Sequence, residues 1–194
     1  MSSEPYKRLG TSEYSNSRSC CRRIPFYCKI IMVVVAVAVL AVIGLIGGYA
    51  ATNPLHASCT VDWKFPAMTC DNVKMKLINQ IKTWTSDENC KNGGEKCLYL
   101  LVSDSGNTLK AKHQTPVKKY TDDLTFTFNN ANPNCNVQGY STSETWYAVL
   151  DQGTNYCNLH NLITGSGLNN VTGSTETTSN YRCTQYSSAN CEKY

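Results

Sequence analysis

Histidine and charged side chains are scarce in this sequence. The 194 residues include three histidines, and Asp, Glu, Lys and Arg make up 16% of the chain, where about 25% is usual. No G-x-S-x-G, H-E-x-x-H or P-loop pattern occurs. His56 lies just after a long apolar run, so His113 or His160 would have to serve as the base in nucleophilic catalysis. Neither stands in a catalytic motif, and we expect neither enzyme activity nor a cofactor.

Closely spaced metal ligands and a basic excess are also missing beyond residue 51. No two cysteines there are closer than seven positions, whereas structural zinc sites use C-x₂₋₄-C pairs. The adjacent acids Asp122 and Asp123 precede a predicted strand, as in a solvated turn. Lys and Arg are as numerous as Asp and Glu in residues 52–194, so no basic face is indicated. The sequence thus predicts neither a metal site nor a nucleic-acid partner.

One long apolar run dominates the N-terminal part of the chain. Residues 30–51 carry no charge. As a helix they would extend about 33 Å, enough to cross a hydrocarbon core of about 30 Å. A single transmembrane helix is therefore predicted over 30–51, with the lipid bilayer as its partner.

The distribution of charge predicts the orientation of this helix. Residues 1–29 contain six Lys and Arg but two acids, and the first charge after the run is Asp62. Lys and Arg beside a membrane span stay in the cytosol, which predicts a type II, single-pass signal-anchor in the plasma membrane or a secretory-pathway membrane. The alternative is a cleaved signal peptide, whose apolar region is shorter, about 7–15 residues. The predicted organisation is a cytosolic tail (1–29), the anchor (30–51), a stalk (52–58) and an extracellular domain (59–194).

The cysteines divide at the same place. Just before the run, Cys20, Cys21 and Cys28 are candidates for palmitoylation, the alternative being reduced cytosolic thiols. An even number of cysteines in an oxidising compartment indicates disulfide bonds. We expect four bridges, with Cys90–Cys97 and Cys183–Cys191 paired as near neighbours. The eight cysteines concerned are Cys59, Cys70, Cys90, Cys97, Cys135, Cys157, Cys183 and Cys191.

A single sequon predicts a glycoprotein. Asn170-Val171-Thr172 is the only N-x-[ST] sequence, since Asn53 is followed by Pro54. It lies in a polar stretch on the predicted outer side of the membrane, where glycosylation takes place. Asn170 is therefore the predicted glycosylation site.

Hydrophobic periodicity predicts an α+β extracellular domain. Val73, Leu77, Ile81 and Trp84 recur at helical spacing, with Asp71 as the expected N-cap. A second helix is expected over 155–163, and 129–134 is expected to be a loop. Strand patterns fall at 97–103, 108–115, 124–128, 135–142 and 145–151. This order predicts an antiparallel meander sheet packed on two helices, as in cystatin-like domains.

Two cysteine-bounded segments resemble a known family. Cys59 to Cys70, with Trp63 between them, and Cys183 to Cys191, followed by Glu192-Lys193, are similar to the two ends of a type II C-type lectin-like domain. The central tryptophan-glycine motif and the calcium-binding Glu/Asn-Pro pairs of that family do not occur between them. The resemblance covers a small part of residues 52–194.

Aromatic residues are the strongest indication of function. The chain has 12 tyrosines and three tryptophans, which supply the rigid amphipathic area that interfaces favour. We expect a non-enzymatic recognition module for an extracellular protein or glycan. The alternative is a pocket for a small apolar ligand such as a lipid, lined by Phe126 and Phe128. The candidate contact residues are Tyr140, Trp146, Tyr147, Tyr156 and His160.

Overall fold

A computed structural model describes residues 26–52 and 54–194 of the chain. The first element is helix α1, Phe26–Thr52, which contains the apolar run predicted over 30–51. Its segment Phe26–Ala51 is long and apolar enough to cross a membrane. Hydrophobic residues surround this helix on all sides, and nearly all of them are exposed. A surface helix of a soluble domain instead carries one apolar stripe.

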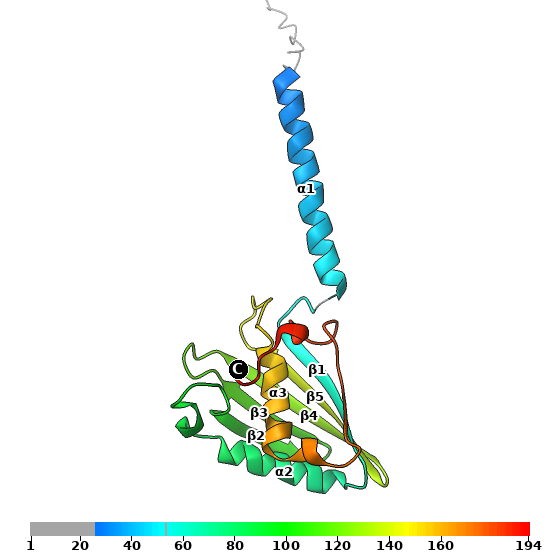
Figure 1. The fold of residues 1–194 in the computed structure, drawn as a ribbon, viewed down its shortest axis with the longest axis vertical. Coiled ribbons are helices and arrows are strands. Elements are labelled where there is room, and N and C mark those ends of the chain that lie inside the picture. The colour runs from blue at the N-terminus through cyan, green and yellow to red at the C-terminus, as the bar shows by residue number, and fades with distance from the viewer. Residues whose placement is uncertain (1–25, 53) are drawn as a thin grey trace, which may run out of the picture. The chain divides into compact units, whose positions relative to one another are not determined.

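The remaining residues form the predicted α+β domain. Six antiparallel strands make one sheet in the order β2-β3-β4-β5-β1-β6, and two helices lie across one of its faces (Figure 1). The elements are β1 Ser58–Phe65, α2 Cys70–Thr83, β2 Tyr99–Ser105, β3 Thr108–Gln114, β4 Thr121–Ala131, β5 Asn134–Ser143, α3 Thr154–Gly165 and β6 Thr175–Thr177, with short 3₁₀ turns at Glu88–Cys90, Leu168–Asn170 and Tyr186–Ser188.

The core fills the space between the sheet and the two helices. Alternate residues of the strands point inward, among them Val61, Trp63 and Phe126, and meet buried residues of α2 and α3. Each such large side chain contributes about 1.5–3 kcal/mol by leaving water. Gly139 faces the same space from β5, where a Cβ would stand 2.7 Å from Cζ3 of Trp63. The indole therefore occupies the volume that a side chain at position 139 would need.

Four disulfides cross-link this domain. The predicted pair Cys90–Cys97 is confirmed, but the predicted pair Cys183–Cys191 is wrong. Cys183 forms an isolated β-bridge with Cys59 and is bonded to it, and the chain then turns so that Cys191 reaches α3. Consequently the two segments similar to the ends of a lectin-like domain are not closed on themselves. The other two bonds are Cys70–Cys135 and Cys157–Cys191.

Several predicted elements differ from those observed. Residues 145–151 form a loop and not a strand, because their exposed apolar side chains do not alternate with buried ones. The expected loop 129–134 is the tip of a hairpin, since β4 continues to Ala131 and β5 begins at Asn134. Strands β1 and β6 were not predicted. The pattern of β1, with every second residue buried, is a clear strand signal that lies next to the predicted stalk.

The boundaries of the first domain helix and of the stalk also shift. Helix α2 begins at Cys70 with Thr69 as its N-cap, whose hydroxyl accepts from the Asn72 amide, whereas Asp71 was expected to be the cap. At the stalk, Ser58 already belongs to β1, and Ala57 is buried with its amide bonded to the Ala148 carbonyl at 2.8 Å. The free linker between α1 and the domain is therefore shorter than residues 52–58.

Candidate functional site

The five predicted contact residues lie in three different places. Tyr140 projects from β5 and is partly exposed. Trp146 and Tyr147 stand in the loop that follows β5, largely exposed and in edge-to-face contact with each other. Tyr156 and His160 are one turn apart on α3, with their rings stacked. The structure thus brings together two pairs, but it does not assemble a single site from all five.

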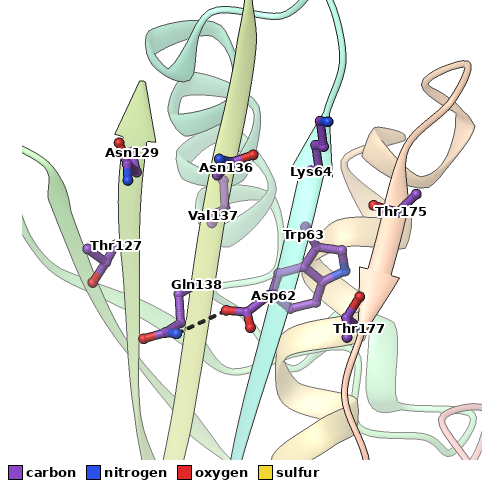
Figure 2. A pocket seen from close by; sticks show the side chains of 10 residues that line it. All are labelled: Asp62, Trp63, Lys64, Thr127, Asn129, Asn136, Val137, Gln138, Thr175 and Thr177. Atoms are coloured by element: carbon purple, nitrogen blue, oxygen red, sulfur yellow. Dashed lines mark hydrogen bonds between the residues drawn. The ribbon is translucent and has the colours of Figure 1, made fainter. Parts of the chain in front are cut away.

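The face of the sheet opposite the helices is open. Successive strand residues alternate between the two faces of a sheet. The residues that alternate with the buried ones on β1, β4 and β5 therefore point away from the core. Asp62 and Lys64 of β1 are two of them, and Gln138 of β5 is a third. They line a hollow of about 430 Å³ that spans β4, β5, β1 and β6 (Figure 2). We call this hollow the sheet-face hollow; it is the first candidate site.

Most of the residues that line the sheet-face hollow have hydrogen-bonding side chains. The Asp62 carboxylate accepts from Gln138 Nε2 at 2.9 Å and from an Arg182 guanidinium nitrogen at 2.6 Å. Burial alone would raise the pKa of Asp62, but these two hydrogen bonds outweigh it and lower the pKa. The carboxylate is therefore ionised at neutral pH. The remaining lining offers hydroxyl, amide and ammonium groups from Thr127, Asn129, Asn136, Lys64, Thr175 and Thr177.

An aromatic ring stands on the same face. Tyr140 is two residues beyond Gln138 on β5, so both side chains point to the open side, and Tyr140 is paired with Thr60 and Thr125. Its Cα lies about 7 Å along the strand from that of Gln138. The face therefore combines a polar hollow with an exposed ring, an arrangement suited to binding a ligand rich in hydroxyl groups.

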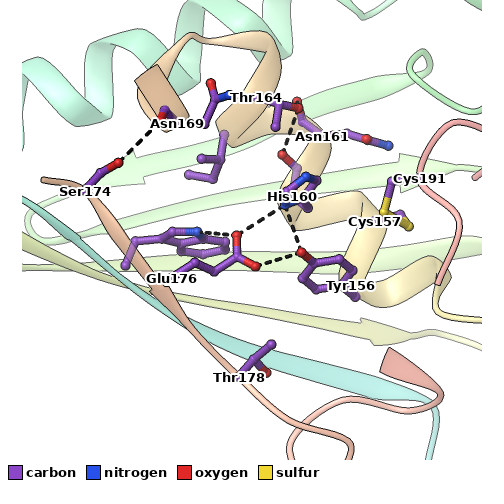
Figure 3. Close-up of polar contacts among 12 residues, drawn as sticks. Tyr156, Cys157, His160, Asn161, Thr164, Asn169, Ser174, Glu176, Thr178 and Cys191 are labelled. Carbon is purple, nitrogen blue, oxygen red and sulfur yellow. Dashed lines mark hydrogen bonds and ion pairs between the residues drawn. A yellow bond between two sulfur atoms is a disulfide. The ribbon is translucent and has the colours of Figure 1, made fainter. Parts of the chain in front are cut away.

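A second cluster joins α3 to β6 and β1. Tyr156 donates its hydroxyl to Glu176 Oε1 at 2.7 Å, and Trp63 Nε1 donates to Glu176 Oε2 at 2.9 Å. His160 Nδ1 lies 3.2 Å from Glu176 Oε2 and 3.0 Å from the Tyr156 hydroxyl (Figure 3). Glu176 is thus the centre of the cluster, and no local sequence pattern links it to its three partners.

The chemistry of this cluster favours a structural role. Burial raises the pKa of Glu176, but hydrogen bonds from His160, Tyr156 and Trp63 outweigh it and lower the pKa. Burial and the neighbouring Glu176 carboxylate raise the pKa of Tyr156 well above its usual value. The hydroxyl nearest to His160 is therefore a poor nucleophile at neutral pH. The bonds among these groups fasten the short strand β6 to the helix.

A polar network lies buried beneath α3. Asn158 Nδ2 donates to Asp122 Oδ2 at 2.7 Å, and the Tyr99 hydroxyl donates to the Asn158 carbonyl at 3.0 Å. Burial raises the pKa of Asp122 to about 6, so this acid is not the solvated turn residue that the sequence suggests. Burial likewise lowers the pKa of His113 to about 4. His113 is fully buried, its ring packs at a tilt against the Tyr99 ring, and its Nε2 lies 2.9 Å from the Glu95 carbonyl oxygen.

A larger cavity of about 690 Å³ opens among the loops near this network. Residues 115–120, 143–154 and the C-terminal end border it. Glu95 lines this cavity, and burial together with the neighbouring Asp122 raises the Glu95 pKa to about 7. One oxygen of Glu95 is buried without a hydrogen-bond partner. The cavity is the second candidate site, and most of its lining residues belong to loops.

The predicted modification sites fall on different parts of the chain. Asn170 and Thr172 are both exposed, at the end of the 3₁₀ turn that precedes β6. Cys28 is an exposed free cysteine on α1. Cys20 and Cys21 lie outside the described residues. Within residues 26–52 and 54–194, no group of three or more His, Cys, Asp or Glu side chains is placed to hold a metal ion.

The chain matches no protein-family model, no curated protein and no solved structure.

Proposed function

We propose that this protein is a type II single-pass membrane protein whose outer domain is a non-enzymatic recognition module for a glycan or protein ligand. The observation that carries the proposal is the sheet-face hollow, a concavity on an uncovered sheet face with an exposed aromatic ring beside it. The four disulfides support an oxidising compartment for this domain.

The anchor is the first part of the proposal. The excess of Lys and Arg before α1 favours a cytosolic N-terminus. A tag placed after Tyr194 should bind antibody on unpermeabilised cells, or be protected inside sealed vesicles if the protein stays intracellular. The mass of the mature chain should include residues 1–29. A mature chain that begins beyond residue 51 would show that the helix is a cleaved signal.

The lining of the hollow favours a glycan over an apolar ligand. Hydroxyl, amide and carboxylate groups can exchange hydrogen bonds with sugar hydroxyls, and the partly exposed Tyr140 offers a ring face against which a sugar ring can pack. The alternative lipid pocket has less support. Phe126 and Phe128 are packed in the core, at 0% and 2% exposure, and line neither of the two cavities.

Ligand capture tests the hollow. The full chain in detergent micelles should bind a glycan array, and Lys64→Ala or Tyr140→Ala should weaken binding about tenfold, equal to ~1.4 kcal/mol. Lys76→Ala is the matched control, because Lys76 is an exposed lysine on α2, away from the open face. If the ligand is a protein, proximity labelling on intact cells should tag it. Labelling should fall in Lys64→Ala and Tyr140→Ala and stay unchanged in Lys76→Ala.

Two results would contradict the proposal. Binding that is equally strong in Lys64→Ala, Tyr140→Ala and Lys76→Ala would place the ligand elsewhere. A hydrolytic activity that disappears in His160→Ala while the fold is retained would replace the recognition module with an enzyme centred on the Tyr156–His160–Glu176 cluster.

A further inference from the structure

One end of the sheet lies close, along the chain, to the membrane anchor. Strand β1 starts there at Ser58, opposite Thr142 near the end of β5. The start of β4 and the end of β3 lie at the same end, because Asp122 pairs with Ser143 and Gln114 with Thr121. We call this the tether end. It carries the segment 54–57, the β3–β4 loop and the loop 144–153.

The loops of the tether end expose large apolar side chains. Trp146 is 85% exposed and Val117 is 87% exposed. These residues and their neighbours form what we call the tether-end rim: Leu55, Val117, Tyr120, Trp146, Tyr147 and Leu150, each about half exposed or more. A small soluble domain gains nothing by presenting these groups to water, and such a concentration at one end indicates a surface that something covers.

The length of the linker limits what can cover the rim. Helix α1 ends at Thr52, and the backbone amide of Ala57 is bonded to the carbonyl of Ala148 in the middle of loop 144–153. Five residues span at most about 18 Å even when fully extended. His56 Nε2 also lies 2.9 Å from the Ser143 carbonyl, which fixes the last part of the linker to the domain. Loop 144–153 therefore cannot move far from the point where the chain leaves the bilayer.

The composition of the rim matches the membrane interface. Trp and Tyr concentrate at the headgroup level of membranes, because their rings are apolar and their N–H and O–H groups stay hydrated. Headgroups occupy a layer about 5–8 Å thick on each side of the hydrocarbon core. Lys118 and Lys119, exposed beside Val117, add ammonium groups that can pair with lipid phosphates.

We propose that the tether-end rim lies in the headgroup layer of the bilayer that α1 spans, so that the domain is held to the membrane at two places. The proposal rests on the anchoring of α1 proposed above. The rim inserts as an interfacial wedge, with Trp146 and Leu150 in the outer part of the acyl region and the lysines at the phosphates. This contact also fixes the orientation of the domain, and the sheet-face hollow, bordered by residues toward the other ends of β1, β4 and β5, is left accessible.

Tryptophan fluorescence of the full chain in phospholipid vesicles tests the proposal. Trp63 belongs to the core and Trp84 is partly buried against it, whereas Trp146 is exposed. Phosphatidylcholine with acyl chains brominated near the headgroup should quench most of the Trp146 emission, and Trp146→Phe should remove this quenching. The matched control adds Asn130→Trp in the Trp146→Phe chain. Asn130 is exposed near the β4–β5 tip, about 27 Å along β4 from Asp122, so its tryptophan should not be quenched.

The possible results distinguish a failure of the rim proposal from a failure of the proposed α1 anchor. Protein that resists carbonate extraction and floats with the vesicles, but whose quenching is the same with and without Trp146, would overturn the rim proposal and leave the anchor standing. Trp146 shielded from acrylamide without quenching by brominated lipid would also overturn it, because a protein surface would then cover the rim. Extraction by carbonate would refute the anchor itself.

Discussion

Replacing Asp122 by Asn should stabilise the domain at neutral pH. Asp122 is 4% exposed, and its carboxylate accepts a hydrogen bond from Asn158 Nδ2 beneath α3. Asparagine has nearly the same shape, and its amide oxygen can accept the same bond. The substitution therefore keeps the contact and removes the cost of burying a charge.

The magnitude follows from the shift in the Asp122 pKa. Burial raises this pKa from 3.8 to about 6, so the folded state holds a proton that the unfolded state has released between these two values. The cost of ionisation is absent below pH 3.8, grows as the pH rises, and is complete above pH 6. A shift of this size corresponds to about 3 kcal/mol. Asp122→Asn should thus exceed the parent in stability by about 3 kcal/mol at pH 7.5 and equal it near pH 3.5.

Urea unfolding of the full chain in detergent micelles, followed by tryptophan fluorescence at several pH values, measures this difference. The pKa of His113 is lowered to about 4 by burial, which destabilises the fold as pH falls. That effect is present in both proteins, so it cancels when the two are subtracted. The quantity to plot is therefore the difference in free energy of unfolding, and not either curve alone.

The neighbouring acid provides the control. Asp123 lies on the opposite face, partly exposed and paired with Lys112 at 2.8 Å. Asp123→Asn should lower stability by less than about 1 kcal/mol, because exposed ion pairs contribute little. A pH-independent difference for Asp122→Asn, or a loss of stability at pH 7.5, would refute the conclusion that a buried charge is present at this position.

Three further predictions concern covalent structure and packing. Replacing Cys59 and Cys183 together by Ser should lower the free energy of unfolding by about 5 kcal/mol, since the bond closes a long loop; an unchanged denaturation midpoint would contradict this. Gly139→Ala should cost about 1–3 kcal/mol by overpacking against Trp63, so a calorimetric melt that matches the parent would show that the indole can move aside. Asn170→Gln should abolish the gel shift that an N-glycosidase produces, and a shift that persists would place the glycan elsewhere.

The layers of the fold could be predicted from local patterns. Helical spacing from Val73 to Ile81 and the alternation in residues 108–115 each depend on near neighbours in the chain, and both elements are present in the structure. The loop 145–151 was misassigned because an exposed Trp-Tyr-x-Val-Leu run resembles a strand when burial is unknown. The apolar side chains of this loop are exposed, and the sequence alone does not show whether an apolar run is buried or exposed.

The candidate sites depend on contacts between distant residues, which a single sequence does not reveal. Asp62 meets Gln138 and Arg182 only because β1 pairs with β5 and the C-terminal segment returns to β1. Glu176 meets His160 through the same return of the chain. The disulfides show the difference most clearly. The bond Cys90–Cys97 is local in sequence and could be predicted, whereas Cys183 is bonded to Cys59, 124 residues earlier in the chain.

The disulfides that join Cys59 to Cys183 and Cys70 to Cys135 also affect how the domain would carry mechanical force. A ligand held in the sheet-face hollow would pull on the strands, and the anchor would resist at the start of β1. The shortest covalent path between the two runs along β1, from Cys59 to Asp62 and Lys64, and the Cys70–Cys135 bond adds a second path that leads to Gln138 on β5. A force applied to the C-terminal segment would reach the start of β1 through the bond between Cys183 and Cys59. The residues that these bonds bypass would bear little of the load, so the domain would transmit a pull to the anchor with little lengthening.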